Sequence, residues 1–226
     1  MKYKLGYVLK VPTGTQAYFS LGSLMREVIH QLALKELNGT AITRAMASEL
    51  LERLWPSAIF GSKLEDVERK VRAEQMLDTY LEWLEHNDND VVAAESEFLF
   101  PLNDRNVKGY IDRLERTKDG EYVVIDFKTG STSLSRNTIR DDIQMNTYCL
   151  AVLHKFGELP KRASLVYIER NKTVNYIPDA EHVEQQKVRL EGIVGNVLNE
   201  EFPATPSFGC KFCGYADLCD YEKRSR

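Results

Sequence analysis

The stretch "GYIDRLERTKDGEYVVIDFKTG" spans residues 109–130 and has the pattern of two β-strands joined by a tight turn. Residues 118–120 suit a three-residue loop that ends in a left-handed glycine. In the register that this loop sets, Asp112 lies directly opposite Asp126. A two-residue loop would instead pair Asp126 with Arg113 and turn Asp112 to the other face. The length of the turn therefore decides whether the two acids meet.

The charged end of the second strand points to a cation site. Side chains alternate along a strand, so Lys128 shares the face of Asp126. Two carboxylates directly opposite each other repel unless a cation lies between them, and a divalent metal with oxygen ligands meets that need. Such a site could orient a water and stabilise an anionic transition state on a phosphodiester. From spacing alone, a hairpin with solvated charged ends stays equally open.

The bulk properties indicate an ordinary globular protein. The chain has 226 residues, 43% of them hydrophobic and 28% charged, with a formal net charge of −4. This length is enough for one domain with a core. No apolar run reaches the roughly 20 residues of a membrane span, and the N-terminal stretch lacks the apolar segment of a secretory signal. We therefore expect a cytoplasmic protein without a membrane partner.

Periodicity along the chain predicts an α/β fold with a helical N-terminal third, a mixed β-sheet flanked by helices, and a Cys-rich tail. Helices are expected at 20–37, 40–54, 62–86, 138–156 and 180–199. Strands are expected at 91–100, 106–117, 121–129, 163–170 and 173–178. We expect a single domain over residues 1–226, with a helical part at 1–90, a core at 91–200 and the tail at 201–226.

Residues 109–130 resemble the core motif of the PD-(D/E)XK nuclease superfamily, which has a restriction-endonuclease-like sheet. The branch they most resemble is the RecB-type nucleases, including the AddB-like and CRISPR-adaptation iron–sulfur nucleases. The resemblance implies Mg²⁺ or Mn²⁺ as cofactor. It makes Asp112 and Asp126 metal ligands, with the backbone carbonyl of Phe127 as a further ligand, and Lys128 the catalytic lysine.

The next helix carries a second motif of that family, Gln-x-x-x-Tyr, as Gln144 and Tyr148. A spacing of four places both side chains on one helical face. The resemblance implies that they lie near the active site and help to position DNA and the lysine. Without the preceding motif, a core position for Tyr148 would be the better interpretation.

Two positions of the expected metal shell are less well defined. The family motif Gly-Ser-x-x-His would place its histidine ligand at Arg26, whereas this chain has His30 one turn later. Either His30 reaches the metal or the histidine ligand is absent. Glu97 matches an acidic residue that the family often carries before the first aspartate. Glu95 has the same strand parity and stays an alternative.

Three of the four cysteines, Cys210, Cys213 and Cys219, lie near the C-terminus. Their spacing resembles the iron–sulfur motif of the AddB-like and CRISPR-associated branch, which implies a 4Fe–4S cluster, and zinc is the other metal that thiolates favour. Both need four ligands. The first residues resemble the stretch that follows the family's upstream cysteine, so we expect the fourth ligand before Met1 in a longer parent. Cys149 is the alternative ligand, although a buried small residue is the better interpretation for it.

The sequence thus predicts a metal-dependent DNA nuclease. The resemblance favours an exonuclease on single-stranded ends, in DNA repair, recombination or CRISPR adaptation, with a helicase domain or subunit as a partner. The candidate DNA contacts are Arg113, Arg136 and Arg140. Two alternatives stay open: a catalytically impaired nuclease-fold module that binds DNA or a helicase, and a zinc- or cluster-binding structural domain.

Overall fold

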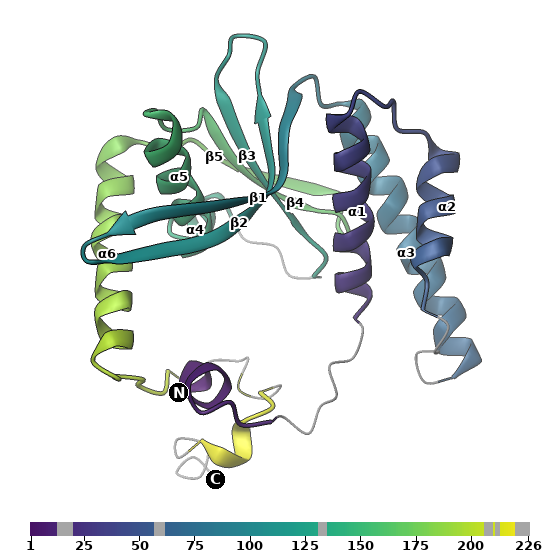
Figure 1. Cartoon of the computed structure of the whole chain (residues 1–226). Coiled ribbons are helices and arrows are strands. Elements are labelled where there is room, and N and C mark those ends of the chain that lie inside the picture. The colour runs from purple at the N-terminus through teal and green to yellow at the C-terminus, as the bar shows by residue number, and fades with distance from the viewer. Residues whose placement is uncertain (13–19, 57–61, 131–134, 206–209, 211–212, 220–226) are drawn as a thin grey trace. The chain divides into compact units, whose positions relative to one another are not determined.

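A computed structural model describes residues 1–12, 20–56, 62–130, 135–205, 210 and 213–219, without the side chains of residues 136 and 137 (Figure 1). The chain forms two compact units. One is Ser20–Leu190, and the other combines Met1–Phe19 with Glu191–Arg226. The larger unit contains the sheet and the predicted catalytic residues.

The sheet of the larger unit has five strands in the order β1-β2-β3-β4-β5. Strands β3 and β4 are parallel, and all other neighbours are antiparallel, which confirms the predicted mixed sheet. Their bounds are Asp90–Leu102 for β1, Arg105–Arg116 for β2, Tyr122–Lys128 for β3, Arg162–Tyr167 for β4 and Lys172–Tyr176 for β5.

The turn between β2 and β3 has the predicted length. Thr117 N–H donates to the carbonyl of Glu121, and Gly120 adopts a φ of +87°, a left-handed conformation that glycine accepts without strain. The ladder then pairs Arg116 with Tyr122 and continues to Arg113 and Ile125. The three-residue loop and its register are therefore confirmed.

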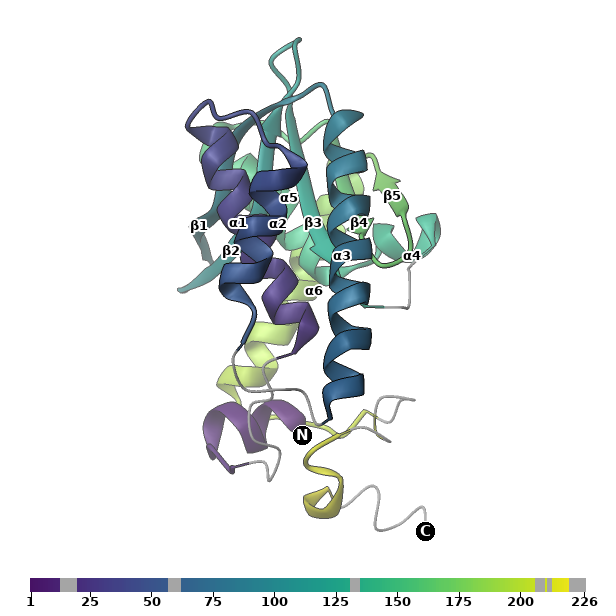
Figure 2. The same cartoon turned by 90° about the vertical axis from the view of Figure 1, so that its right-hand side faces the viewer.

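Three capped helices cover one face of this sheet, as Figures 1 and 2 show: α1 (Leu21–Leu37), α2 (Arg44–Leu54) and α3 (Lys63–Glu85). Ser20, Thr43 and Ser62 each accept a backbone N–H at a helix start. The three helices share an apolar core with β3 and β4. Tyr80 and Trp83 of α3 contact the ring of Phe127 edge-on.

The other face carries α4 (Arg136–Arg140), α5 (Ile143–Phe156) and the start of α6 (Ala180–Leu198) (Figure 1). The prediction of one helix over 138–156 is wrong, because α4 and α5 are separate helices. Asp142 explains the break: its backbone is extended and its carboxylate accepts the N–H of Met145, so it caps a new helix. The register of α5 is thereby set at its first turn.

The smaller unit contains a π-helix, η1 (Lys4–Val8), and a 3₁₀-helix, η3 (Ala216–Leu218). The ring of Tyr3 stacks on Tyr7 and on Phe202, with centroids 5.1 and 5.8 Å apart. The Tyr215 hydroxyl donates to the carbonyl of Val11 at 3.2 Å. Within the described ranges of both units, no helix combines the length and apolar character needed to cross a membrane.

Candidate active site

The acidic pair lies where β2 and β3 begin to separate. The ladder between these strands runs to Arg113 and Ile125, so the next position sets Asp112 opposite Asp126. Asp112 Oδ2 accepts the backbone N–H of Phe127 at 3.1 Å, which fixes that carboxylate against β3. Asp126 is fully buried, and its pKa rises to about 6 because of burial and, next, the negative charge of Asp112.

A chain of contacts connects this pair to α5. Lys128 Nζ lies 2.7 Å from Asp126 Oδ2 and donates to Gln144 Oε1 at 2.7 Å. Gln144 in turn donates from Nε2 to the Tyr148 hydroxyl at 2.7 Å. Burial raises the pKa of Tyr148 well above its ordinary range, so the hydroxyl stays protonated. The structure thus brings together all five residues that the sequence predicted as catalytic.

The carboxylate of Asp126 lacks the donors that a buried acid normally has. Neither of its oxygens accepts a hydrogen bond of regular geometry from the described residues, although Lys128 stands close by. A buried carboxylate without donors is costly and seldom persists without a purpose. Two adjacent carboxylates with free lone pairs are the donor set that Mg²⁺ prefers, so these residues fit a divalent cation.

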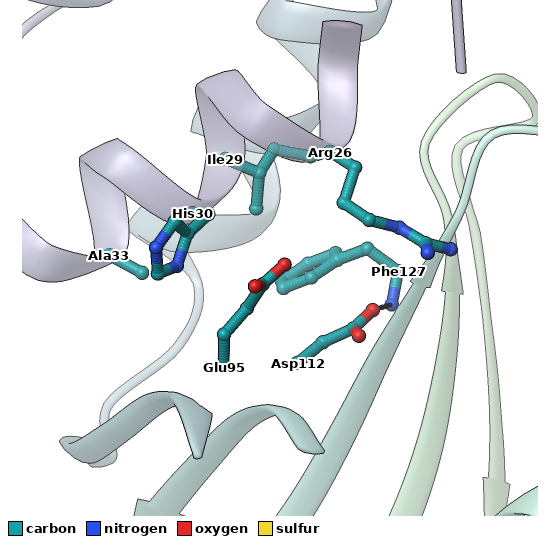
Figure 3. A pocket seen from close by; sticks show the side chains of 7 residues that line it. All are labelled: Arg26, Ile29, His30, Ala33, Glu95, Asp112 and Phe127. Carbon is teal, nitrogen blue, oxygen red and sulfur yellow. Dashed lines mark hydrogen bonds between the residues drawn. The ribbon is translucent and has the colours of Figure 1, made fainter. Parts of the chain in front are cut away.

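A small cavity lies beside Asp112 and is closed by α1, as Figure 3 shows. Its walls come from two sources, α1 and the sheet. The lining residues are Arg26, Ile29, His30, Ala33, Glu95, Asp112 and Phe127. The Nδ1 atom of His30 is buried and has no hydrogen-bond partner among the described residues. His30 therefore lies in the neighbourhood that its predicted role requires.

Glu97 does not belong to this cavity. Its side chain is 50% exposed, pairs with Lys108 at 2.8 Å and accepts the Tyr110 hydroxyl at 2.8 Å. A supporting role of Glu97 in the metal shell stays a prediction, and the alternative, Glu95, is the glutamate that lines the cavity. Glu95 falls opposite Asp112 in the β1–β2 register and has a φ of +43°. This irregular backbone explains why strand parity could not separate the two glutamates.

A complete ligand set is not assembled. The described parts of the chain contain no group of three or more His, Cys, Asp or Glu side chains placed to hold a metal ion. The roles of Asp112, Asp126, His30 and the Phe127 carbonyl as ligands therefore stay predictions. Phe127 has two other contacts here: its ring packs in the core and its N–H binds Asp112.

Arg113 does not contact solvent, so its predicted role as a DNA contact is corrected. It is fully buried, and its guanidinium forms a two-point ion pair with Glu36 of α1 at 2.6 and 2.7 Å. Its Nε donates to Glu115, which is also fully buried, at 2.5 Å. Although burial opposes the charge, these carboxylates raise the pKa of Arg113. Each nitrogen of the guanidinium thus has a carboxylate partner, and none is exposed to a phosphate.

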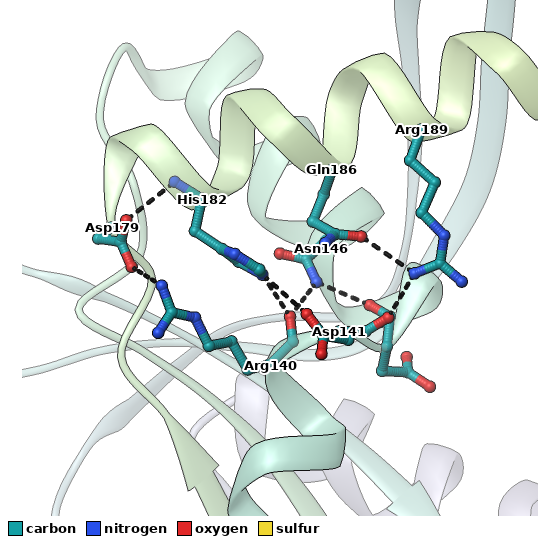
Figure 4. Close-up of polar contacts among 8 residues, drawn as sticks. Arg140, Asp141, Asn146, Asp179, His182, Gln186 and Arg189 are labelled. Atoms are coloured by element: carbon teal, nitrogen blue, oxygen red, sulfur yellow. Dashed lines mark hydrogen bonds and ion pairs between the residues drawn. The ribbon is translucent and has the colours of Figure 1, made fainter.

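The other two predicted DNA contacts lie at α4. Arg140 is exposed and pairs with Asp179 at 3.1 Å, and its carbonyl accepts His182 Nε2 and Asn146 Nδ2 (Figure 4). Its backbone is thus fixed while its guanidinium faces solvent. Arg136 starts α4, but its side chain lies outside the described residues. A DNA contact at either arginine stays a prediction.

The cysteines of the tail, Cys210, Cys213 and Cys219, are half-buried. They form no metal-binding group among the residues that the structure covers. Cys149 is fully buried in α5, and burial raises the pKa of its thiol to about 12. Because metals bind the thiolate, this environment favours the interpretation of Cys149 as a buried small residue.

Sequence reasoning missed the contact between Gly22 and Thr129. A Cβ built on Gly22 would stand 2.6 Å from the hydroxyl oxygen of Thr129, so a larger residue at position 22 would force Thr129 or α1 to shift. Thr129 directly follows Lys128. A glycine in the first turn of a helix, where it costs helix stability, was the signal that could have found it.

Comparison with known proteins agrees with this geometry. The model of the PD-(D/E)XK nuclease superfamily matches residues 1–220, so the chain belongs to that superfamily, which implies a phosphodiester hydrolase. No curated protein matches the chain. A crystal structure from Eubacterium rectale, described as that of a predicted exonuclease, has a TM-score of 0.55 at 12% identity, covering 99% of this chain and 80% of that one. The crystal structure of SSO0001 matches with a TM-score of 0.45 at 13% identity, and the alignment covers 88% of this chain and 85% of that one.

Proposed function

We propose that the chain is a divalent-metal-dependent DNA nuclease that acts on single-stranded ends. The observation that carries this proposal is the buried carboxylate of Asp126, which adjoins Asp112. Among the described residues it accepts no hydrogen bond of regular geometry, and the ammonium of Lys128 lies 2.7 Å from one of its oxygens. A structural ion pair would have its oxygens satisfied, as those of Glu115 are. An acid kept short of donors suits a ligand that arrives with the substrate.

Asp112 and Asp126 would hold the cation, together with His30 or Glu95 from the adjoining cavity and the Phe127 carbonyl. A bound Mg²⁺ or Mn²⁺ supplies a Lewis acid and lowers the pKa of a coordinated water. The protein's part is to aim both carboxylates at one point. The backbone N–H of Phe127 holds the carboxylate of Asp112 in place.

Lys128 would orient the attacking water or stabilise negative charge on the phosphate. Its ammonium is held from two sides, by Asp126 and by the amide oxygen of Gln144. Tyr148 fixes Gln144 by accepting its amide N–H. A charge held in place before reaction loses little to reorganisation in the transition state. Gln144 and Tyr148 therefore act as positioning residues for the lysine.

The finer parts of the proposal have narrower support. The Eubacterium rectale structure supports exonuclease action only through its fold and its description. Single-stranded DNA, a helicase partner, a cytoplasmic location, a role in DNA repair, recombination or CRISPR adaptation, and a 4Fe–4S cluster at the tail cysteines are supported by sequence resemblance alone. The match over residues 1–220 supports one nuclease domain.

A catalytically impaired module that binds DNA or a helicase is the second candidate. The observation in its favour is Arg26, which occupies the position of the family's histidine ligand and contributes to the wall of the cavity beside Asp112. An arginine cannot ligate a metal, because it has no free lone pair. The presence of Asp126 and Lys128 side by side argues for the active enzyme, and a cleavage assay decides between the two.

The test is a cleavage assay on end-labelled single- and double-stranded DNA with Mg²⁺, with Mn²⁺ and with a chelator. We expect metal-dependent cutting of single strands that is lost in Asp126→Ala and Lys128→Ala. The matched controls are Asp88→Ala and Lys63→Ala, which change exposed residues of the same types. Tight DNA binding without cleavage under any metal would favour the impaired module, and cleavage that survives both site variants would refute the proposed site.

A further inference from the structure

Arg26 is a cation at the site that the mechanism above leaves without a role. It projects from the second turn of α1, and Figure 3 shows its side chain reaching toward Asp112 and the backbone of Phe127. It contributes to the walls of two cavities. One is the small cavity beside His30, and the other is larger, about 300 Å³, with mainly polar walls.

The two cations of the site differ in what binds them. The ammonium of Lys128 is paired with Asp126 and bonded to Gln144, so its charge is largely neutralised. Arg26 is exposed, and within the described residues its guanidinium has no hydrogen bond or ion pair. A charge next to two carboxylates that stays unpaired is available to a ligand.

The larger cavity contains donors that suit a phosphate, together with two glutamates. The residues lining it besides Arg26 are Ser20, Gly22, Ser23, Glu27, Glu95 and Thr129. Hydroxyl groups and a guanidinium fork are the donors that recognise phosphate oxygens, and arginine can bind two of them at once. Glu95 borders both cavities, so a phosphate bound at Arg26 would adjoin the acidic pair.

The fold places Arg26 through a close approach of backbone and side chain. Gly22 lies against the hydroxyl of Thr129, at a distance where a Cβ would force one of the two to shift. Arg26 follows Gly22 by four residues and so shares its helical face. The first turn of α1 is thereby seated on the end of β3, and the next turn presents Arg26 to the acids.

We infer that Arg26 binds the scissile phosphate of the substrate and stabilises the negative charge that develops on it. This inference rests on the proposed nuclease function. It assigns to this chain an arginine clamp where the family resemblance implies a metal-binding histidine, and it leaves His30, one turn further along α1, free for the cavity beside Asp112.

Kinetics of Arg26→Ala and Arg26→Lys give the first test. Arg53→Ala is the control, because Arg53 is an exposed helical arginine that lines neither cavity. We expect kcat to fall about 100-fold for Arg26→Ala, the usual effect of removing one preorganised donor. The kcat of Arg26→Lys should lie between those of Arg26→Ala and the unmodified protein, because an ammonium point charge replaces the forked guanidinium. An unchanged kcat, or recovery at high Mg²⁺, would overturn the inference, since recovery would mean that Arg26 acts on the metal site.

Binding gives a second test that needs no cleavage. In an Asp126→Asn background with chelator, single-stranded oligonucleotides each carry one uncharged methylphosphonate, which is moved along the strand. At one position of the strand, the methylphosphonate should weaken binding to the protein that retains Arg26. It should not weaken binding to the Arg26→Ala variant any further. The salt dependence of binding should also lose about 0.7 of a counterion in Arg26→Ala. If both proteins respond identically to the methylphosphonate at every position, the inference is overturned.

The outcomes separate this inference from the proposed function. If the unmodified protein neither cuts nor binds DNA, the proposed function fails and the inference with it. If the protein cuts and Arg26→Ala behaves like Arg53→Ala, only the inference fails. Thermal melting checks that each variant folds. If Arg26→Ala does not fold, Arg26→Lys, which keeps a long aliphatic side chain and the positive charge, takes its place in the methylphosphonate comparison.

Discussion

Replacing Asp126 by asparagine should stabilise the metal-free protein at neutral pH. Burial and the charge of Asp112 raise the pKa of Asp126 from an ordinary 3.8 to about 6, so the folded state favours the protonated acid. A rise of this size corresponds to about 3 kcal/mol of folding free energy. Asparagine resembles the neutral acid and therefore removes the cost of burying the charge.

The sign of the pH dependence follows from the raised pKa. A group that binds its proton more tightly when folded contributes stability at pH below its unfolded pKa and loses that contribution as pH rises through the folded value. The difference in free energy of unfolding between Asp126→Asn and the unmodified protein should thus be small at pH 4. It should grow through pH 6 and reach about 3 kcal/mol at pH 7.

Urea unfolding in the presence of chelator, between pH 4 and 8, measures this difference. The two tryptophans, Trp55 and Trp83, both lie in the larger unit, so their fluorescence reports on the unit that contains Asp126. Adding Mg²⁺ should stabilise the unmodified protein and leave Asp126→Asn unaffected. A difference that stays flat with pH, or a variant that is less stable at pH 7, would refute the reasoning.

Three further perturbations follow from contacts in the larger unit and in α6. Gly22→Ala should destabilise the protein by about 1–3 kcal/mol through overpacking and reduce cleavage. The control is Gly192→Ala, at an exposed helical position with nothing within 4 Å of a new Cβ, which should stabilise by about 1 kcal/mol. Equal shifts in melting temperature for the two variants would contradict this. Arg113→Ala should cost about 3–5 kcal/mol in urea unfolding because it leaves Glu115 buried without its cation, and a loss under about 1 kcal/mol would contradict it. Tyr148→Phe should lower kcat about tenfold with little change in melting temperature, since it removes the acceptor that positions Gln144; an unchanged kcat would contradict that role.

Local rules predicted the part of the site that depends on short-range geometry. The three-residue turn set the register of β2 and β3, and strand alternation brought Lys128 to the face of Asp126. Helical spacing of four was enough to connect Gln144 with Tyr148. Each of these relations involves residues close in sequence or fixed by one hydrogen-bonded turn, so the chain itself contains the information.

Relations between distant segments were not predictable in the same way. Arg113 has the residue type of a surface contact, and its burial depends on Glu36, which is 77 residues away in the sequence. Glu95 and Glu97 share a parity, and only the left-handed backbone at Glu95 brings one of them into the cavity. Neither the ion pair nor the backbone irregularity has a periodic signal that a sequence pattern could reveal.

These distant contacts explain how the fold holds the site. Helix α1 is fixed to the sheet at both ends, by Gly22 against Thr129 near its start and by Glu36 paired with Arg113 near its end. Arg26 and His30 lie between these two contacts. The ion pair of Arg113 with Glu36 holds α1 in place, while Asp126 accepts no regular hydrogen bond from the described residues and has only an ion pair with Lys128. The ion pair of Arg113 with Glu36 is therefore needed for the site at Asp126 and Lys128, because it sets where the side chains of α1 meet the acids.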